Sequence, residues 1–125
     1  MDIKKFWNAV LKQDAEKLKT FFKDTAYVNW HCTNEHFTVD EYIRANCEYP
    51  GDWDGTIERI EKVGSLIITV VNVFTIDKES SFHVVSFMEI EDDNKIIAMN
   101  EYWSDDDTAP QWRLQKNIGT TIFKR

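Results

Sequence analysis

Apolar residues recur every three or four positions near the start of the chain, a spacing typical of an amphipathic helix. The positions that carry this pattern are Phe6, Trp7, Val10 and Leu11. They predict a first helix over residues 2–12. Asp14 favours the N-cap of a second helix, whose apolar face continues to about residue 23.

Two polar residues mark the start of a third helix. Thr38 and Glu41 have the spacing of a capping box, in which the threonine hydroxyl accepts from the glutamate amide and the glutamate carboxylate accepts from the threonine amide. Pro50 and Gly51 end this helix. Trp53 is therefore expected in the loop that follows. Trp53 and Tyr42, which lies within the predicted helix, either cover a pocket mouth or pack in the core.

Alternation of apolar and polar residues replaces the helical spacing in the remaining segments. It predicts strands over residues 26–32, 56–63, 66–76, 81–91 and 95–104, joined by polar turns. Between residues 66 and 76, the odd-numbered and the even-numbered residues are both mainly apolar, so this strand is expected to be buried on both faces. The helices would cover one face and a second copy of the chain the other. A short helix is predicted from Pro110 to Lys116.

Composition and charge narrow the class of protein and its partners. Apolar residues make up 42% and aromatic residues 14% of 125, enough for a packed core and a lined cavity in one domain, residues 1–125. The net charge of −7 disfavours nucleic acid and anionic membranes. No spanning segment or signal peptide is visible. Cys32 and Cys47 lack close spacing, so two reduced thiols and a cytoplasmic location are expected.

The order of elements resembles the nuclear transport factor 2-like (SnoaL-like) superfamily. Two or three helices precede a long meander that ends in Glu101-Tyr102-Trp103-Ser104, and the likeness extends from Phe6 to about Asp105. The resemblance implies an α+β fold in which N-terminal helices pack on a strongly curved, mostly antiparallel or mixed sheet, forming a cone with an internal pocket. Because the strand over residues 66–76 is apolar on both faces, a homodimer through the outer face of the sheet is expected. The fold hosts isomerases, dehydratases, cyclases, epoxide hydrolases and binding domains, so it does not by itself imply a reaction.

Residues 84–90 and 95–104 are locally similar to the last two strands of ketosteroid isomerase. In that family an Asp base works with a Tyr and a protonated Asp that hold the enolate oxygen. The resemblance places the base on Trp30, the Tyr on Phe6 and the protonated Asp on Ser86. None of the three carries the required group, so ketosteroid isomerisation by that mechanism is excluded.

Limonene epoxide hydrolase resembles this chain in another respect. Its final strand carries an inward acid, and Glu101 matches that position. Its inward Arg and second acid fall on Val70 and Asn72. Without the Arg, nothing orients two carboxylates around an attacking water, so a direct copy of this chemistry is not expected.

Strand alternation places Glu101 on the same face as Met99 and Trp103. If the resemblance holds, this face lines a mostly apolar pocket. The expected pocket residues are Phe6, Trp30, Tyr42, Trp53, Asn72, Ser86, Met88, Met99 and Trp103. Apolar surroundings would raise the pKa of Glu101, which suits a general acid or base. Ligand binding without chemistry, or a structural pair with a residue such as Arg113, are the alternatives.

The remaining polar residues offer weaker candidates. His31 and His83 fall on faces opposite the pocket, and His36 falls in a loop, so no metal site and no cofactor are expected. The acidic run of residues 105–107 lacks the pattern of a calcium loop and is expected as a solvated turn and helix cap. The predicted function is binding of a small, largely apolar molecule, either with cofactor-free lyase or isomerase chemistry at Glu101 or as a non-enzymatic ligand-binding or dimerisation module.

Overall fold

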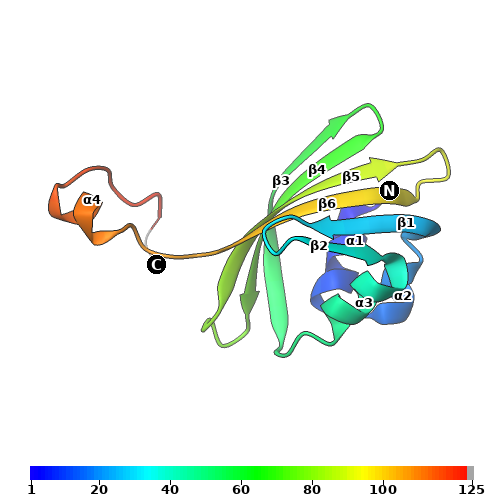
Figure 1. The fold of residues 1–125 in the computed structure, drawn as a ribbon, viewed down its shortest axis with the longest axis horizontal. Coiled ribbons are helices and arrows are strands. Elements are labelled where there is room, and N and C mark those ends of the chain that lie inside the picture. The colour runs from blue at the N-terminus through cyan, green and yellow to red at the C-terminus, as the bar shows by residue number, and fades with distance from the viewer. Residues whose placement is uncertain (124–125) are drawn as a thin grey trace.

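The chain begins with two short helices that lead into the sheet (Figure 1). The computed structural model describes residues 1–123. Helix α1 (Ile3–Leu11) begins after Asp2, whose carboxylate accepts a hydrogen bond from a first-turn amide at 3.0 Å. Helix α2 (Ala15–Lys19) is capped by Asp14 in the same way. The first predicted helix is confirmed.

The second helix is shorter than its hydrophobic pattern predicts. It ends at Lys19, and Phe22 is already the first residue of a strand. Phe22 pairs with Ile96, and the Ile96 amide donates to the carbonyl of Phe21 at 2.9 Å. The prediction of a helix up to residue 23 is wrong, because apolar side chains spaced three and four residues apart also suit a chain that enters the sheet.

Within the described residues, six strands form one open, mixed sheet in the order β2-β1-β6-β5-β4-β3. Their bounds are β1 (Phe22–Trp30), β2 (Glu35–Thr38), β3 (Trp53–Val63), β4 (Leu66–Thr75), β5 (Ser81–Ile90) and β6 (Ile96–Asp105). All neighbours are antiparallel except β1 and β6, which run parallel. Register shifts interrupt three of these pairings and bend the sheet. The predicted α+β fold with a curved, mixed sheet is confirmed.

Two strand segments lie where the sequence predicts loops. β2 carries no clear alternation, yet it pairs with β1 along the edge of the sheet, with His36 opposite Asn29. Trp53 is not in a loop: it begins β3 and pairs with Thr75. Between them, the predicted third helix is confirmed as α3 (Val39–Cys47), which the expected capping box opens.

The core lies between the helices and one face of the sheet. Thr69, Ser86 and Glu101 are neighbours across that face, and all three are buried. Trp7 of α1 donates from Nε1 to Thr69 Oγ at 3.1 Å, which ties the helix to the sheet. Other fully buried core side chains are Phe6, Leu18, Val28, Val71, Val84, Met88, Ile96 and Met99.

Asn72 lies on the opposite face of the sheet. Thr69, Val71 and Val73 face the helices, so alternation along β4 directs Asn72 outwards. Its amide nitrogen donates to an Asp106 carboxylate oxygen at 3.1 Å. The prediction that Asn72 lines the pocket is therefore wrong. Both alternating sets of β4 are apolar, so the hydrophobic pattern could not decide which set faces inwards.

The prediction of a fully solvated turn at residues 105–107 is wrong, because Asp106 anchors this segment to the sheet, although Asp105 and Asp107 are exposed. The Asp106 side chain is only 8% exposed, accepts a hydrogen bond from Ser81, and contacts Nδ1 of His83. Nε2 of His83 lies 3.0 Å from Glu58. The hydrogen bond to Asp106 raises the pKa of His83 above its ordinary value. The predicted helix cap is also wrong, because α4 begins after Pro110 without a side-chain cap.

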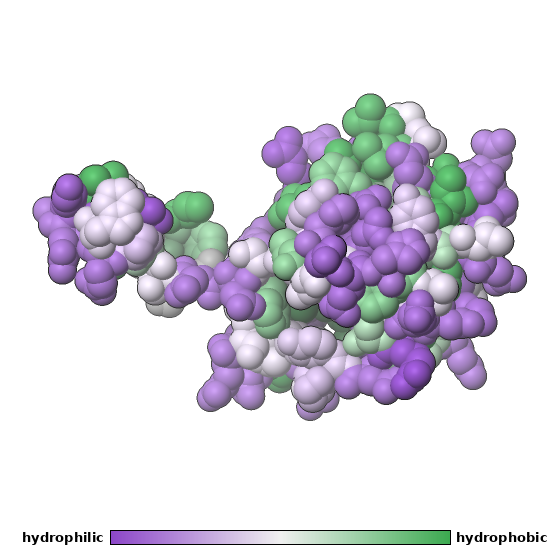
Figure 2. All heavy atoms as spheres, in the orientation of Figure 1, coloured by the Kyte–Doolittle hydropathy of each residue, from purple (hydrophilic) through white to green (hydrophobic). Residues whose placement is uncertain are grey.

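The C-terminal segment stands apart from the rest of the molecule (Figures 1 and 2). It contains α4 (Gln111–Gln115), which confirms the short helix predicted there, and none of the α4 residues is buried. Residues 124–125, the end of the predicted domain, lie outside the described part. No helix within residues 1–123 is long and apolar enough to cross a membrane.

Candidate ligand-binding site

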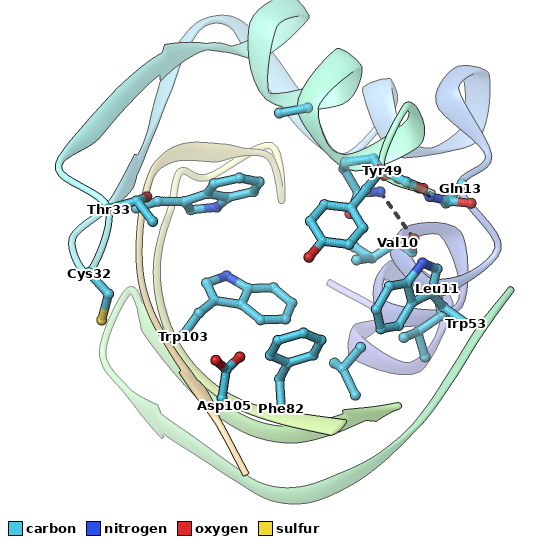
Figure 3. A pocket seen from close by; sticks show the side chains of 14 residues that line it. Val10, Leu11, Gln13, Cys32, Thr33, Tyr49, Trp53, Phe82, Trp103 and Asp105 are labelled. Atoms are coloured by element: carbon cyan, nitrogen blue, oxygen red, sulfur yellow. Dashed lines mark hydrogen bonds between the residues drawn. The ribbon is translucent and has the colours of Figure 1, made fainter. Parts of the chain in front are cut away.

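A cavity of about 340 Å³ opens between the sheet and the helices α1 and α3 (Figure 3). Its size lies in the range of small-molecule sites. The lining residues are Val10, Leu11, Gln13, Trp30, Cys32, Thr33, Ala45, Asn46, Tyr49, Trp53, Val73, Phe82, Trp103 and Asp105. They come from segments spread between residues 10 and 105, so the site exists only in the folded chain.

Five aromatic rings form a continuous wall around this cavity. Trp30 contacts Trp103 with ring centroids 6.3 Å apart, and Trp103 contacts Phe82 at 6.2 Å. Phe82 contacts Trp53 at 5.7 Å, and Trp53 contacts Tyr49 at 5.4 Å. Successive rings are inclined at 41° to 77° to one another. The wall therefore curves around the cavity, because steeply inclined rings cannot stack in a flat layer.

Two amide side chains hold the helical side of the cavity in place. Gln13 follows α1 with a positive φ of 54°, and its amide nitrogen donates to the carbonyls of Asn46 and Tyr49 at 2.9 and 2.7 Å. Asn46 of α3 donates in return to the carbonyl of Val10 at 3.0 Å. These bonds join the end of α1 to α3, so the two helices cover the cavity as one unit.

Glu101 lies buried next to the cavity, and its carboxylate is held by three donors. Trp30 Nε1 donates to Oε1 at 3.0 Å, and Trp103 Nε1 makes a longer contact to the same oxygen at 3.4 Å. Ser86 Oγ donates to Oε2 at 2.5 Å. The side chain is only 1% exposed. The carboxylate thus orients two indoles of the aromatic wall, and it does not itself line the cavity.

Burial raises the pKa of Glu101 above its ordinary value, although the hydrogen bonds from Ser86, Trp30 and Trp103 act in the opposite direction. The neighbouring Tyr42 hydroxyl has its pKa raised well above the ordinary value, first by burial and then by the charge of Glu101. Both effects favour uncharged forms of the two groups. The alternative pairing of Glu101 with Arg113 does not occur among the described residues, since the three partners of Glu101 are the serine and the two indoles.

The predicted pocket residues occupy three different places. Trp30, Trp53 and Trp103 line the cavity. A second group lies beneath the cavity in the closed core and consists of Phe6, Tyr42, Ser86, Met88 and Met99. Tyr42 is thus a core residue, and Asn72 is on the other face of the sheet. Whether any of these side chains contacts a ligand stays a prediction.

Sequence reasoning missed several cavity residues. Two of them could have been found: Phe82 alternates with Val84 and Ser86, and Asp105 continues the alternation of Glu101 and Trp103. Val10 and Leu11 lie on the predicted apolar face of the first helix, but no periodic signal marks residues 13, 46 and 49. Their position depends on how α1 and α3 meet, which is a tertiary property.

The other chemistry-bearing side chains lie apart from the cavity or at its rim. His31 stacks on Tyr102 at 4.4 Å on the outer face of the sheet, as predicted. Cys32 and Cys47 are both free thiols. Within residues 1–123 no three His, Cys, Asp or Glu side chains are grouped so that they could hold a metal ion. The Trp53 indole nitrogen is buried and makes no hydrogen bond with another described residue.

Comparison with known proteins identifies the fold. No family model matches the chain, and no curated protein matches its sequence. A proposed ketosteroid isomerase from Kribbella flavida superimposes with a TM-score of 0.75 at 22% identity, over 98% of this chain and 85% of the other. An NTF-2 like protein of unknown function from Burkholderia xenovorans gives 0.74 at 23% identity, over 90% and 88%. The chain has the nuclear transport factor 2-like fold.

Further structures of this fold have varied descriptions. An LEH-like epoxide hydrolase from M. tuberculosis superimposes with a TM-score of 0.65 at 16% identity, over 82% of this chain and 79% of the other. A hypothetical protein with a ketosteroid isomerase-like fold from Catenulispora acidiphila, solved in complex with trimethylamine, also gives 0.65, at 12% identity over 82% and 84%. These likenesses establish the nuclear transport factor 2-like architecture, and the function must be argued from the site.

Proposed function

We propose that this protein binds a small, largely apolar molecule in the cavity between the sheet and the helices α1 and α3. The observation that carries the proposal is the open, aromatic-walled volume of about 340 Å³ above an otherwise packed core. Core packing normally leaves few voids larger than a water molecule. An apolar ligand of about ten heavy atoms would fit this space and replace weakly held water.

Structural neighbours support small-molecule binding as the general use of the fold. Their descriptions include ketosteroid isomerase, SnoaL-like polyketide cyclase and LEH-like epoxide hydrolase, and one neighbour holds trimethylamine. None of these descriptions transfers to this chain at identities of 10–23%. The apolar lining of the cavity favours a small, largely apolar molecule as the ligand.

Cofactor-free lyase or isomerase chemistry at Glu101 is a second candidate, favoured by the raised pKa of this buried carboxyl. General acids and bases are often tuned in this way. The geometry favours binding over catalysis, because Glu101 does not line the cavity. Trp30 or Trp103 would have to move before the carboxylate could reach a ligand.

A thermal-shift screen of small ketones and alcohols tests the binding proposal. At a ligand concentration a hundred times Kd, we expect Tm to rise by on the order of 10 °C. Trp53→Leu removes one cavity wall and should abolish most of this rise. Trp112→Leu, the same change at a residue that is 57% exposed on α4, should leave it unchanged. Equal rises in both variants would refute binding at this cavity.

Glu101→Gln separates the two candidate functions. It removes the ionisable group while an amide of the same shape keeps partners for the two indoles and Ser86. A binding protein should retain the ligand-induced rise in this variant. An enzyme should retain it as well but lose turnover of the ligand, followed by NMR of the ligand over hours.

We further propose that the protein is a homodimer formed through the outer face of the sheet. Val70, Val85 and Tyr102 are neighbours across that face, and Tyr102 is 43% exposed. Light scattering at micromolar concentration should give twice the mass of the chain. Val85→Glu should halve this mass, whereas Val63→Glu, at a position that is 65% exposed at the end of β3, should not. A monomeric wild type would remove the proposal.

The cytoplasm is the compartment that we propose for this protein. Cys32 and Cys47 are both free, and reducing compartments preserve free thiols. Fractionation of the producing cells, with an antibody against the chain, tests this location.

A further inference from the structure

The residues that line the cavity carry negative charge and no positive charge. Of the fourteen lining residues, only Asp105 carries a formal charge, and none is Lys, Arg or His. Within residues 1–123, no side-chain donor or cation is paired with the Asp105 carboxylate. It is exposed at the end of β6, and Figure 3 shows it beside Trp103 and Phe82 at the edge of the cavity.

Four polar donors at the cavity are already engaged. The amide nitrogens of Gln13 and Asn46 donate to backbone carbonyls. The indole nitrogens of Trp30 and Trp103 donate to Glu101, which lies behind them. The Trp53 indole nitrogen remains as a neutral donor without a partner among the described residues, but no lining side chain is a cation that would favour an anionic ligand. What the wall offers instead is aromatic ring surface.

Aromatic rings attract organic cations through the negative potential of their faces. The wall of Trp30, Trp103, Phe82, Trp53 and Tyr49 places five rings around one cavity, with neighbouring centroids 5.4–6.3 Å apart. The net charge of −7 adds a potential that concentrates cations and repels anions. A compact, weakly hydrated cation with apolar substituents suits both the rings and the carboxylate at the rim.

We infer that the ligand is a small organic cation, with a tertiary or quaternary alkylammonium group held by the aromatic wall and by Asp105. This inference rests on the proposed function, because it names the chemical class of the molecule that occupies the same cavity. The apolar substituents of such a group contact the rings, while its positive charge lies within reach of the rim carboxylate.

Choline and its uncharged carbon isostere, 3,3-dimethylbutan-1-ol, provide the test. The two molecules match in shape and differ in charge, so their affinities isolate the contribution of the cation. We expect choline to bind the full chain about tenfold more tightly, measured by NMR titration of the tryptophan indole N–H signals. Perturbation should be largest for Trp53 and the other cavity indoles and absent from Trp112 on α4.

The outcomes separate this inference from the proposed function. Equal binding of choline and the alcohol would overturn the cation preference and leave the apolar pocket in place. Binding of the alcohol without binding of choline would also overturn the cation preference and leave the apolar pocket in place. If neither binds, the inference falls, and the separate screen of ketones and alcohols decides whether the cavity binds any ligand.

Asp105→Asn tests the rim carboxylate, with Asp107→Asn as a matched control. Both substitutions remove one negative charge from the same acidic segment, but Asp107 does not line the cavity. Asp105→Asn should weaken choline binding several-fold without changing the affinity for the alcohol, and Asp107→Asn should change neither. Equal weakening by both variants would show a general effect of net charge and would overturn the assigned role of Asp105.

Discussion

Glu101→Leu is expected to lower the free energy of unfolding by about 3 kcal/mol, while Glu101→Gln stays within about 1 kcal/mol of the wild type. Leucine leaves the indole N–H groups of Trp30 and Trp103 and the hydroxyl of Ser86 without their acceptor. Each buried donor without a partner costs about 1–3 kcal/mol. Glutamine can accept from both indoles through its carbonyl and donate to Ser86 Oγ through its amide.

Urea unfolding at pH 7 measures both variants against the wild type. A leucine variant as stable as the wild type would mean that the buried carboxylate contributes no net stability. That outcome is physically reasonable only if the cost of burying its charge cancels the three hydrogen bonds. Destabilisation by glutamine equal to that by leucine would contradict the proposed exchange of donor and acceptor at Ser86.

The wild type and Glu101→Gln, compared over a range of pH, also report the ionisation of Glu101. Its pKa is raised in the folded state, so the folded protein holds this proton more tightly than the unfolded chain. The resulting stability is fully present below the ordinary pKa of 4.5 and is lost as pH rises through the folded-state pKa. Between these values, the stability of the wild type should fall relative to Glu101→Gln. Parallel stability curves would show that Glu101 titrates normally.

His83 does not confuse this comparison. Its pKa is also raised, chiefly by Asp106, so its contribution is likewise lost as pH rises above the folded-state pKa. Because His83 titrates in both proteins, subtracting one stability curve from the other removes its effect. The difference that remains belongs to Glu101 and to the groups that sense its charge, such as Tyr42.

Hydrophobic patterning predicted which face of a strand points into the core only where the two faces differ in polarity. In β6, alternation placed Glu101 and Trp103 together on the inner face, and the structure confirms that they share it. In β4 both sets of alternating residues are apolar, and the pattern could not tell that Thr69 faces α1 while Asn72 faces outwards. A single polar contact, from Trp7 to Thr69, identifies the inner face.

The candidate site was predictable only in part for a related reason. Trp30 and Trp103 follow from strand alternation, because each strand directs alternate side chains to one face. Gln13 and Asn46 do not, since their position depends on hydrogen bonds between α1 and α3. Asp106 shows the same limit: its sequence suggests a solvated turn, yet contacts from β4 and β5 bury it.

Trp7→Ala is expected to have the largest effect on stability, a loss of about 3–5 kcal/mol. The Trp7 side chain is 1% exposed, lies against the Phe6 ring, and donates to the buried Thr69 hydroxyl. Alanine removes the packing and leaves a cavity, and it also leaves Thr69 without its partner. Lys4→Ala, at an exposed position of the same helix, should change stability by less than about 0.5 kcal/mol.

Thermal and urea unfolding of Trp7→Ala and Lys4→Ala measure this difference in stability. The ligand-induced rise in Tm of the same two variants measures their ligand binding. α1 carries Val10 and Leu11 at the cavity, so loosening its contact with the sheet should weaken ligand binding together with stability. Lys4→Ala should retain both. If Trp7→Ala unfolded as the wild type does, α1 could not be packed on β4 as described. If it lost stability but kept full affinity, the cavity would be held by the bonds of Gln13 and Asn46 instead of by the core beneath it.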